Sequence, residues 1–100
     1  MSQNLPARAR VVIVGGGVIG CSIAYHLTKL GVSDVLLIEK DQLTAGTTWH
    51  AAGLITSAGY HDDTSLWMAR YSRDLYARLE EETGHSTGFR PVGHLSVATS

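Results

Sequence analysis

The sequence predicts an α/β fold that begins with the strand–helix–strand unit of a doubly wound parallel sheet. Three observations predict it. Two short apolar runs, at residues 11–14 and 35–38, have the length and composition of strands in a parallel sheet. The residues between them carry apolar side chains at helical spacing. A glycine-rich turn at residues 15–20 separates the first run from that helix, and a right-handed crossover would bring the two strands side by side.

The first strand, residues 11–14, has the sequence Val-Val-Ile-Val, and this β-branched run predicts burial on both faces. The helix is expected over residues 18–30, with Lys29 in its last turn and Gly31 ending it. Its apolar positions are Ile19, Ile23, Leu27 and Leu30. The second strand, residues 35–38, has the sequence Val-Leu-Leu-Ile and leads into an acidic residue.

The chain after the second strand divides into a loop, a long helix and a final strand. Residues 41–60 are interrupted by glycines and predict an ordered loop, with a short helix within residues 47–54. A longer helix is expected over residues 63–83, with Asp62 and Asp63 at its start and Gly84 at its end. Its apolar face holds Met68, Tyr71, Leu75, Tyr76 and Leu79, and its i,i+4 charge pairs are Arg70–Asp74, Asp74–Arg78 and Arg78–Glu82. Residues 93–98 alternate apolar and polar side chains, which predicts a half-buried strand.

Composition excludes several classes of function. The chain has 8 Lys and Arg against 9 Asp and Glu, and this near-neutral balance argues against a nucleic-acid partner. The one cysteine, Cys21, excludes an intrachain disulfide framework and a multi-cysteine zinc site, and the histidines lack metal-ligand spacing. The uncharged stretch at residues 11–25 is too short and too rich in glycine for a membrane helix. We therefore expect a cytoplasmic protein without a metal or a membrane partner.

Chain length bears on the domain organisation. The 100 residues are 44% apolar, which is enough for a core, but a chain of this length is marginal as an independent fold. We therefore interpret residues 1–100 as the N-terminal portion of a larger domain. On this interpretation the 100-residue chain is catalytically inert by itself.

Residues 15–20, Gly-Gly-Gly-Val-Ile-Gly, form a GxGxxG fingerprint between the first strand and the helix. Gly15 is expected to make the tight turn, Gly17 to let the backbone approach a pyrophosphate, and Gly20 to pack the helix on the sheet. The N–H groups at the start of the helix then face the phosphates. Glu39 stands 19 residues after Gly20, where an acid accepts hydrogen bonds from ribose hydroxyls and disfavours the 2′-phosphate of NADP.

The fingerprint alone does not separate NAD from FAD. If the chain binds no nucleotide, the same residues are only a glycine-rich turn beside a surface glutamate. Residues 44–53 favour FAD. A simple NAD domain is expected to continue promptly with another helix and strand, whereas this segment has small residues, hydroxyls and exposed N–H groups. Such a segment suits close passage along a long cofactor.

Three segments together resemble the dimethylglycine and sarcosine dehydrogenase family of D-amino-acid-oxidase-like FAD enzymes. They are the glycine fingerprint, the pair Glu39-Lys40, and residues 43–54, Leu-Thr-Ala-Gly-Thr-Thr-Trp-His-Ala-Ala-Gly-Leu. The similarity continues through residues 79–84 and Gly88-Phe89, so it covers nearly the whole chain from about residue 10. Residues 47–54 are its most specific part.

The resemblance implies the N-terminal part of an FAD-binding, Rossmann-like domain. Val18 and Ile19 would lie beside the pyrophosphate, and Glu39 and Lys40 would flank the adenosine ribose. The flavin and its phosphate chain would be lined by Gly46, Thr47, Thr48, Trp49, His50, Ala51, Ala52, Gly53 and Leu54. In the family, a histidine at the position of His50 is joined covalently to the 8α-methyl group of the flavin. Trp49 would either cover the flavin or pack against the protein, and the sequence leaves both open.

The resemblance also implies an activity, the FAD-dependent oxidation of the N-methyl group of dimethylglycine or sarcosine. A folate or an electron-transfer flavoprotein would be a further partner. The substrate carboxylate would need a cation, typically Arg, and the groups that act on the substrate are expected beyond Ser100. Two alternatives stay open: a non-catalytic regulatory flavoprotein, since a regulatory subunit of pyruvate dehydrogenase phosphatase resembles the same family, and an NAD-dependent dehydrogenase with an ordinary Rossmann domain.

Overall fold

The computed structural model describes residues 4–99, which form two compact units that divide after Ala52. The first unit contains strand β1 (Val11–Val14), helix α1 (Val18–Lys29), strand β2 (Val35–Ile38) and the short 3₁₀ helix η1 (Thr47–His50). The second unit contains helix α2 (Asp63–Thr83). No helix within residues 4–99 has the length and apolar character needed to cross a bilayer.

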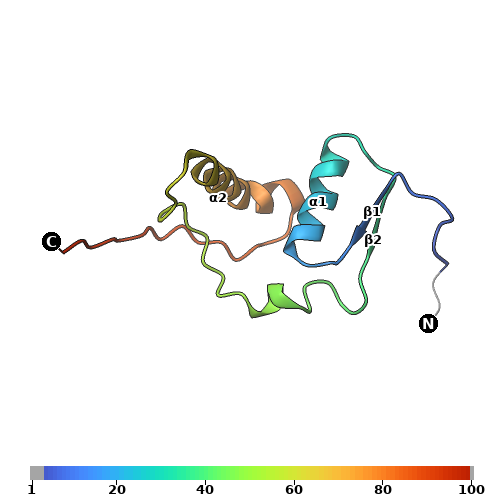
Figure 1. The fold of residues 1–100 in the computed structure, drawn as a ribbon, viewed down its shortest axis with the longest axis horizontal. Helices are drawn as coiled ribbons and strands as arrows, with labels where there is room; N and C mark the ends of the chain where they lie inside the picture. Colours follow the sequence, from blue (N-terminus) through green and yellow to red (C-terminus); the bar gives the residue numbers. More distant parts are fainter. Residues whose placement is uncertain (1–3, 100) are drawn as a thin grey trace. The chain divides into compact units, whose positions relative to one another are not determined.

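The first unit is a βαβ unit with two parallel strands. β1 pairs with β2 in register, from Val11 opposite Val35 to Val14 opposite Ile38. Helix α1 lies alongside the strand pair (Figure 1). These findings confirm the α/β class and the predicted bounds of both strands. The described sheet has two strands, so its continuation as a doubly wound, Rossmann-like sheet stays a prediction.

Within residues 4–99 burial of β1 is one-sided, which differs from the expectation of a strand buried on both faces. Ile13 is 8% exposed, whereas its neighbours Val12 and Val14 are 51% and 84% exposed. Side chains alternate between the two faces of a strand, and α1 packs against the face that carries Ile13. A β-branched run thus predicted the strand correctly, but composition does not determine how many layers cover it.

Helix α1 ends one residue earlier than predicted, at a glycine stop. Leu30 is the C-cap residue, and Gly31 follows with a φ of +91°. The backbone N–H of Gly31 donates to the carbonyl of Thr28 at 3.0 Å, and that of Val32 donates to the carbonyl of Leu27 at 2.9 Å. This pattern is a Schellman motif, in which glycine takes the left-handed conformation without the steric cost that other residues meet.

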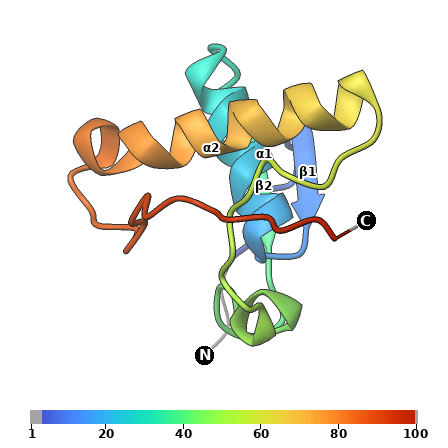
Figure 2. The same cartoon turned by 90° about the vertical axis from the view of Figure 1, so that its left-hand side faces the viewer.

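Helix α2 has the predicted bounds because both of its ends carry capping residues. The Oδ1 atom of Asp62 accepts a hydrogen bond from the backbone N–H of Ser65 at 2.8 Å, which satisfies one of the free donors of the first turn. At the other end, Gly84 has a φ of +74° and its N–H donates to the carbonyl of Glu80 at 2.8 Å. Figure 2 shows the helix along its full length.

The predicted apolar face of α2 is buried only in part. Leu75 is buried, and the ring of Tyr76 lies 6.2 Å from that of Phe89. Met68 and Tyr71, from the same predicted face, are exposed within the described residues. The helical spacing therefore identified the face, and the second unit covers its C-terminal half.

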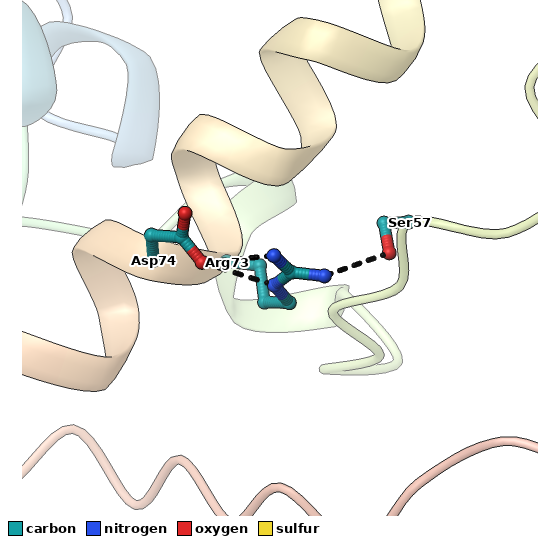
Figure 3. Close-up of polar contacts among 3 residues, drawn as sticks. All are labelled: Ser57, Arg73 and Asp74. Carbon is teal, nitrogen blue, oxygen red and sulfur yellow. Dashed lines mark hydrogen bonds and ion pairs between the residues drawn. The ribbon is translucent and has the colours of Figure 1, made fainter.

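Ion pairs on α2 differ in part from the prediction. Arg78 Nε lies 3.0 Å from Glu82 Oε1, as predicted. Asp74 is instead bound by its neighbour Arg73, whose Nε and Nη2 lie 3.1 and 3.0 Å from Asp74 Oδ1. The Nη1 atom of the same guanidinium reaches the Ser57 hydroxyl at 3.3 Å (Figure 3). Because a guanidinium offers several donors in a fork, Arg73 holds a helix carboxylate and a loop hydroxyl at once, and this arrangement replaces the i,i+4 pairs expected for Asp74.

Residues 93–98 form no strand, so the strand predicted from their alternation is wrong. Figures 1 and 2 show this segment as coil, and its apolar residues Leu95 and Val97 are exposed. A strand needs a neighbour that takes up its backbone hydrogen bonds. Alternation of side chains specifies which face would be buried, but it does not supply that neighbour.

Candidate nucleotide-binding site

The candidate site is a groove of about 1070 Å³ in the first unit. Its lining joins the last residues of β1 and β2, the glycine-rich turn, the first turn of α1 and part of η1. In open parallel sheets, ligands bind in the crevice outside the carboxyl ends of the strands. The groove therefore lies where the fingerprint predicts a nucleotide.

Gly15 and Gly20 shape the turn that leads into the groove. Gly15 has a φ of +110°, and its N–H donates to the carbonyl of Ile38 at 2.8 Å. A Cβ atom at Gly20 would collide with the carbonyl oxygen of Gly15, so α1 can start this close to the turn only with glycine at position 20. Both glycines thus have the backbone roles that the fingerprint predicts, and their part in binding a cofactor stays a prediction.

A hydroxyl from η1 caps the start of α1. The backbone N–H of Val18 donates to Thr48 Oγ1 at 3.0 Å, and a Cβ atom at Gly17 would lie only 2.9 Å from the same oxygen. The missing side chain at Gly17 therefore makes room for an oxygen atom beside the helix N-terminus. Because the N–H groups of a first helical turn lack intrahelical acceptors and attract anions, a phosphate oxygen fits this place as well.

Glu39 lies beside the glycine-rich turn as an ionised acceptor. Its Oε2 atom accepts a hydrogen bond from the backbone N–H of Gly16 at 2.7 Å, and its Oε1 atom accepts one from Asp41 at 3.2 Å. These hydrogen bonds, first that from Gly16, hold the pKa of Glu39 below its ordinary value. A carboxylate offers about four lone-pair sites, so Glu39 keeps acceptor capacity for ribose hydroxyls.

The groove brings together predicted residues from distant parts of the first unit. Those that line it are Gly15, Gly17, Val18, Ile19, Gly20, Glu39, Lys40, Gly46, Thr47, Thr48 and Ala51. The predicted residues outside its lining are Trp49, His50 and Ala52 in the first unit and Gly53 and Leu54 in the second. Gly16 and Asp41 also line the groove and were missed from the sequence. The run of three consecutive glycines is the signal that could have pointed to Gly16.

The two aromatic residues of η1 are open to solvent. Trp49 is 77% exposed, so the described structure does not realise the alternative in which it packs against the protein. His50 ends η1 and is exposed, and its covalent attachment to a flavin stays a prediction. No three His, Cys, Asp or Glu side chains within residues 4–99 are grouped so that they could hold a metal ion.

Comparison with known proteins identifies the family. The sequence pattern of the family described as "DAO: FAD dependent oxidoreductase" matches residues 10–100. The chain belongs to this FAD-dependent oxidoreductase family. The match confirms the resemblance found in the sequence, and the family's cofactor is the one that residues 44–53 favour over NAD.

Curated relatives of the chain are much longer than the chain itself. It is 53% identical over 94 residues to dimethylglycine dehydrogenase, mitochondrial, of Rattus norvegicus, a match that covers 93% of the chain. It is 45% identical over 100 residues to sarcosine dehydrogenase, mitochondrial, of Mus musculus, covering 99% of the chain. It is 48% identical over 97 residues to the pyruvate dehydrogenase phosphatase regulatory subunit, mitochondrial, of Mus musculus, covering 97%. The chain spans 11% of the length of each of these three proteins.

Proposed function

We propose that the protein is an FAD-dependent oxidoreductase that oxidises the N-methyl group of a small N-methylated amino acid, dimethylglycine or sarcosine. Membership of the family supports the reaction class, and the names of two relatives, dimethylglycine dehydrogenase and sarcosine dehydrogenase, support the substrate class. The observation that carries the proposal is the groove at the ends of β1 and β2, where the glycine-rich turn, the start of α1 and Glu39 meet.

The residues of the groove fit the ADP half of FAD. The N–H groups of the first turn of α1 would face the pyrophosphate beside Gly17, with the Thr48 hydroxyl at its border. Glu39 would accept hydrogen bonds from the ribose, and its charge excludes a 2′-phosphate. FAD, when bound, supplies the oxidising power that removes a hydride equivalent from the N-methyl group of the substrate. The Rossmann-like continuation of the sheet belongs to the same proposal.

A spectrum and a turnover assay test the proposal. The test uses the protein that the whole gene encodes. The purified protein is expected to be yellow, with the absorption bands of oxidised flavin. It is expected to demethylate dimethylglycine or sarcosine and to bleach as it does so in the absence of an electron acceptor. A colourless protein that binds NAD would contradict the proposal and support the ordinary Rossmann dehydrogenase.

His50 is the proposed point of covalent attachment, because by the resemblance of residues 47–54 to the family it takes the position of the family's flavin-linked histidine, and an imidazole nitrogen can act as the nucleophile. On a denaturing gel, flavin fluorescence should stay with the wild-type band and be lost from the band of His50→Ala. His61→Ala is the matched control, since it removes an exposed histidine outside residues 47–54, and its band should keep the fluorescence. Fluorescence that stays with His50→Ala, or is absent from the wild type, would contradict the assignment.

A non-catalytic regulatory flavoprotein is the second candidate, and the 48% identity to the phosphatase regulatory subunit favours it. Both candidates would be yellow, so the spectrum does not separate them. Turnover does: a flavin-loaded protein that oxidises neither dimethylglycine nor sarcosine would support the regulatory role. The cytoplasmic location, and a folate or electron-transfer flavoprotein as partner, are further proposals from the sequence.

A further inference from the structure

Gly16 occupies a variable position of the GxGxxG fingerprint, yet both of its backbone polar groups are bound by the loop that follows β2. Its N–H donates to Glu39 Oε2 at 2.7 Å. Its carbonyl accepts a hydrogen bond from the backbone N–H of Thr44 at 2.8 Å, and the thiol of Cys21 lies 3.5 Å from the same oxygen. The glycine-rich turn and the loop are therefore joined through this one residue.

Space, and not backbone conformation, requires glycine at position 16. Gly16 is absent from the glycines with a positive φ. A Cβ atom there would lie 2.6 Å from Leu43 Cδ2, 3.0 Å from Glu39 Oε2 and 3.2 Å from Glu39 Cβ. Leu43 is 59% exposed and its end can swing away. Glu39 Cβ is fixed to the backbone directly after β2, so a methyl group at position 16 would displace the Glu39 side chain.

The conformation of Thr44 shows that the loop is held to the turn against a local preference. Thr44 has a φ of +65°, and it is the one residue other than glycine with a positive φ among residues 4–99. A β-branched residue in this region is an outlier that persists where the surroundings fix it. Here the hydrogen bond from Thr44 to the Gly16 carbonyl holds the loop in place.

We propose that Gly16 is a positioning residue that sets the Glu39 carboxylate for the ribose hydroxyls of an adenine nucleotide. Its N–H orients one carboxylate oxygen, and its missing side chain leaves the space in which Glu39 stands. The preference of the site for ribose over deoxyribose therefore depends on Gly16 and Glu39 together. The inference rests on the proposed function, since it takes the groove to hold the ADP half of FAD.

The test compares ADP with 2′-deoxy-ADP, because the two ligands differ only in one ribose hydroxyl. Calorimetry is done on protein that carries His50→Ala, so that the flavin can be removed before titration. With Gly16 intact, ADP is expected to bind about 10-fold tighter than 2′-deoxy-ADP, the effect of one hydrogen bond to a charged acceptor. Gly16→Ala should weaken ADP about 10-fold and leave 2′-deoxy-ADP nearly unchanged, which brings the ratio of affinities close to one.

Two further variants separate positioning of Glu39 from simple crowding. Leu43→Ala should keep the ratio, because it leaves Gly16 and Glu39 in contact. The double variant Gly16→Ala with Leu43→Ala should still lack the preference, because the contact with Glu39 Cβ persists. A full rescue in the double variant, or equal losses for both ligands in Gly16→Ala, would overturn the inference. If the protein with Gly16 intact binds neither ligand, the proposed nucleotide site itself fails.

One measurement does not depend on the folding of a Gly16 variant. With ¹⁵N-labelled glycine, the amide proton of Gly16 should shift as the pH falls through the titration of Glu39, since protonation removes the charge from its acceptor. The shift should vanish in Glu39→Gln, which keeps an acceptor oxygen but does not titrate. A Gly16 amide that is insensitive to pH in the unmodified protein would overturn the inference.

Discussion

Replacing Gly20 with alanine should destabilise the βαβ unit, and the structure gives the size of the effect. The added Cβ would overlap the carbonyl oxygen of Gly15 and lie 3.3 Å from Ile13 Cγ2. Neither neighbour can rotate away, because the first is backbone and the second belongs to a buried strand residue. Overpacking costs up to about 3 kcal/mol, and the higher helix propensity of alanine offsets about 1 kcal/mol of it. We therefore expect the free energy of unfolding to fall by about 2 kcal/mol.

Urea unfolding followed by circular dichroism measures this loss as a lower midpoint with an unchanged slope. Gly46→Ala is the matched control. Gly46 has a φ of −87°, and a Cβ atom there would meet no other atom within 4 Å. Its replacement should change the free energy of unfolding by less than about 0.5 kcal/mol. Equal midpoints for the two variants would refute the steric argument for Gly20.

Two other substitutions test the loop and the second unit. Thr44→Asn should raise the free energy of unfolding by about 1 kcal/mol, because the left-handed conformation costs less for asparagine than for a β-branched residue. The control Thr44→Val, measured by the same urea unfolding, should bring no gain in stability because valine is also β-branched. Equal gains in the two variants would contradict this explanation. Asp62→Ala should lower the midpoint of thermal unfolding, followed by the helical circular dichroism signal. Asp62→Asn should lower the midpoint much less, because its amide oxygen can still accept the hydrogen bond from the Ser65 N–H. Hydrogen bonds from the Ser65 backbone, then its side chain, hold the pKa of Asp62 below its ordinary 3.8, so its contribution is complete above pH 3.8 and is lost as the pH falls through the lowered pKa. The difference between wild type and Asp62→Ala should therefore shrink as the pH falls below 3.8, and a difference that grows on acidification would contradict the linkage.

The elements that the sequence predicted correctly are those whose limits are set by nearby residues. The stop of α1 is made by the N–H groups of Gly31 and Val32, which bond to carbonyls three and five positions earlier, and Asp62 starts α2 through a hydrogen bond from Ser65. The strand expected at residues 93–98 depends on a distant partner, and no strand forms there. Dependence on distant residues also explains β1: nearby residues predict the strand, but its one-sided burial depends on the elements that pack against it.

The candidate site shows the same division between local and distant causes. The roles of Gly15 and Gly20 follow from the turn itself, so the fingerprint predicted them. The four residues of η1 are consecutive, yet Thr47 and Thr48 line the groove while Trp49 and His50 do not. A 3₁₀ helix has three residues per turn, so successive side chains point about 120° apart. A segment identified by its sequence therefore does not place all of its side chains on one surface.

The hydrogen bonds of the groove indicate how a nucleotide would enter it. Val18 N–H is already satisfied by Thr48, and Gly16 N–H by Glu39. A phosphate oxygen at the start of α1 would replace the Thr48 hydroxyl, so that one hydrogen bond is exchanged for another and the gain comes from the charge of the phosphate near the helix N-terminus. The ribose hydroxyls would instead add to Glu39, whose remaining lone pairs are unused by Gly16 and Asp41. Binding of the phosphate therefore replaces an existing hydrogen bond, whereas the ribose binds to a carboxylate that the glycine-rich turn already holds in position. For this reason Gly16 should govern the preference for ribose and leave the affinity for the phosphates almost unchanged.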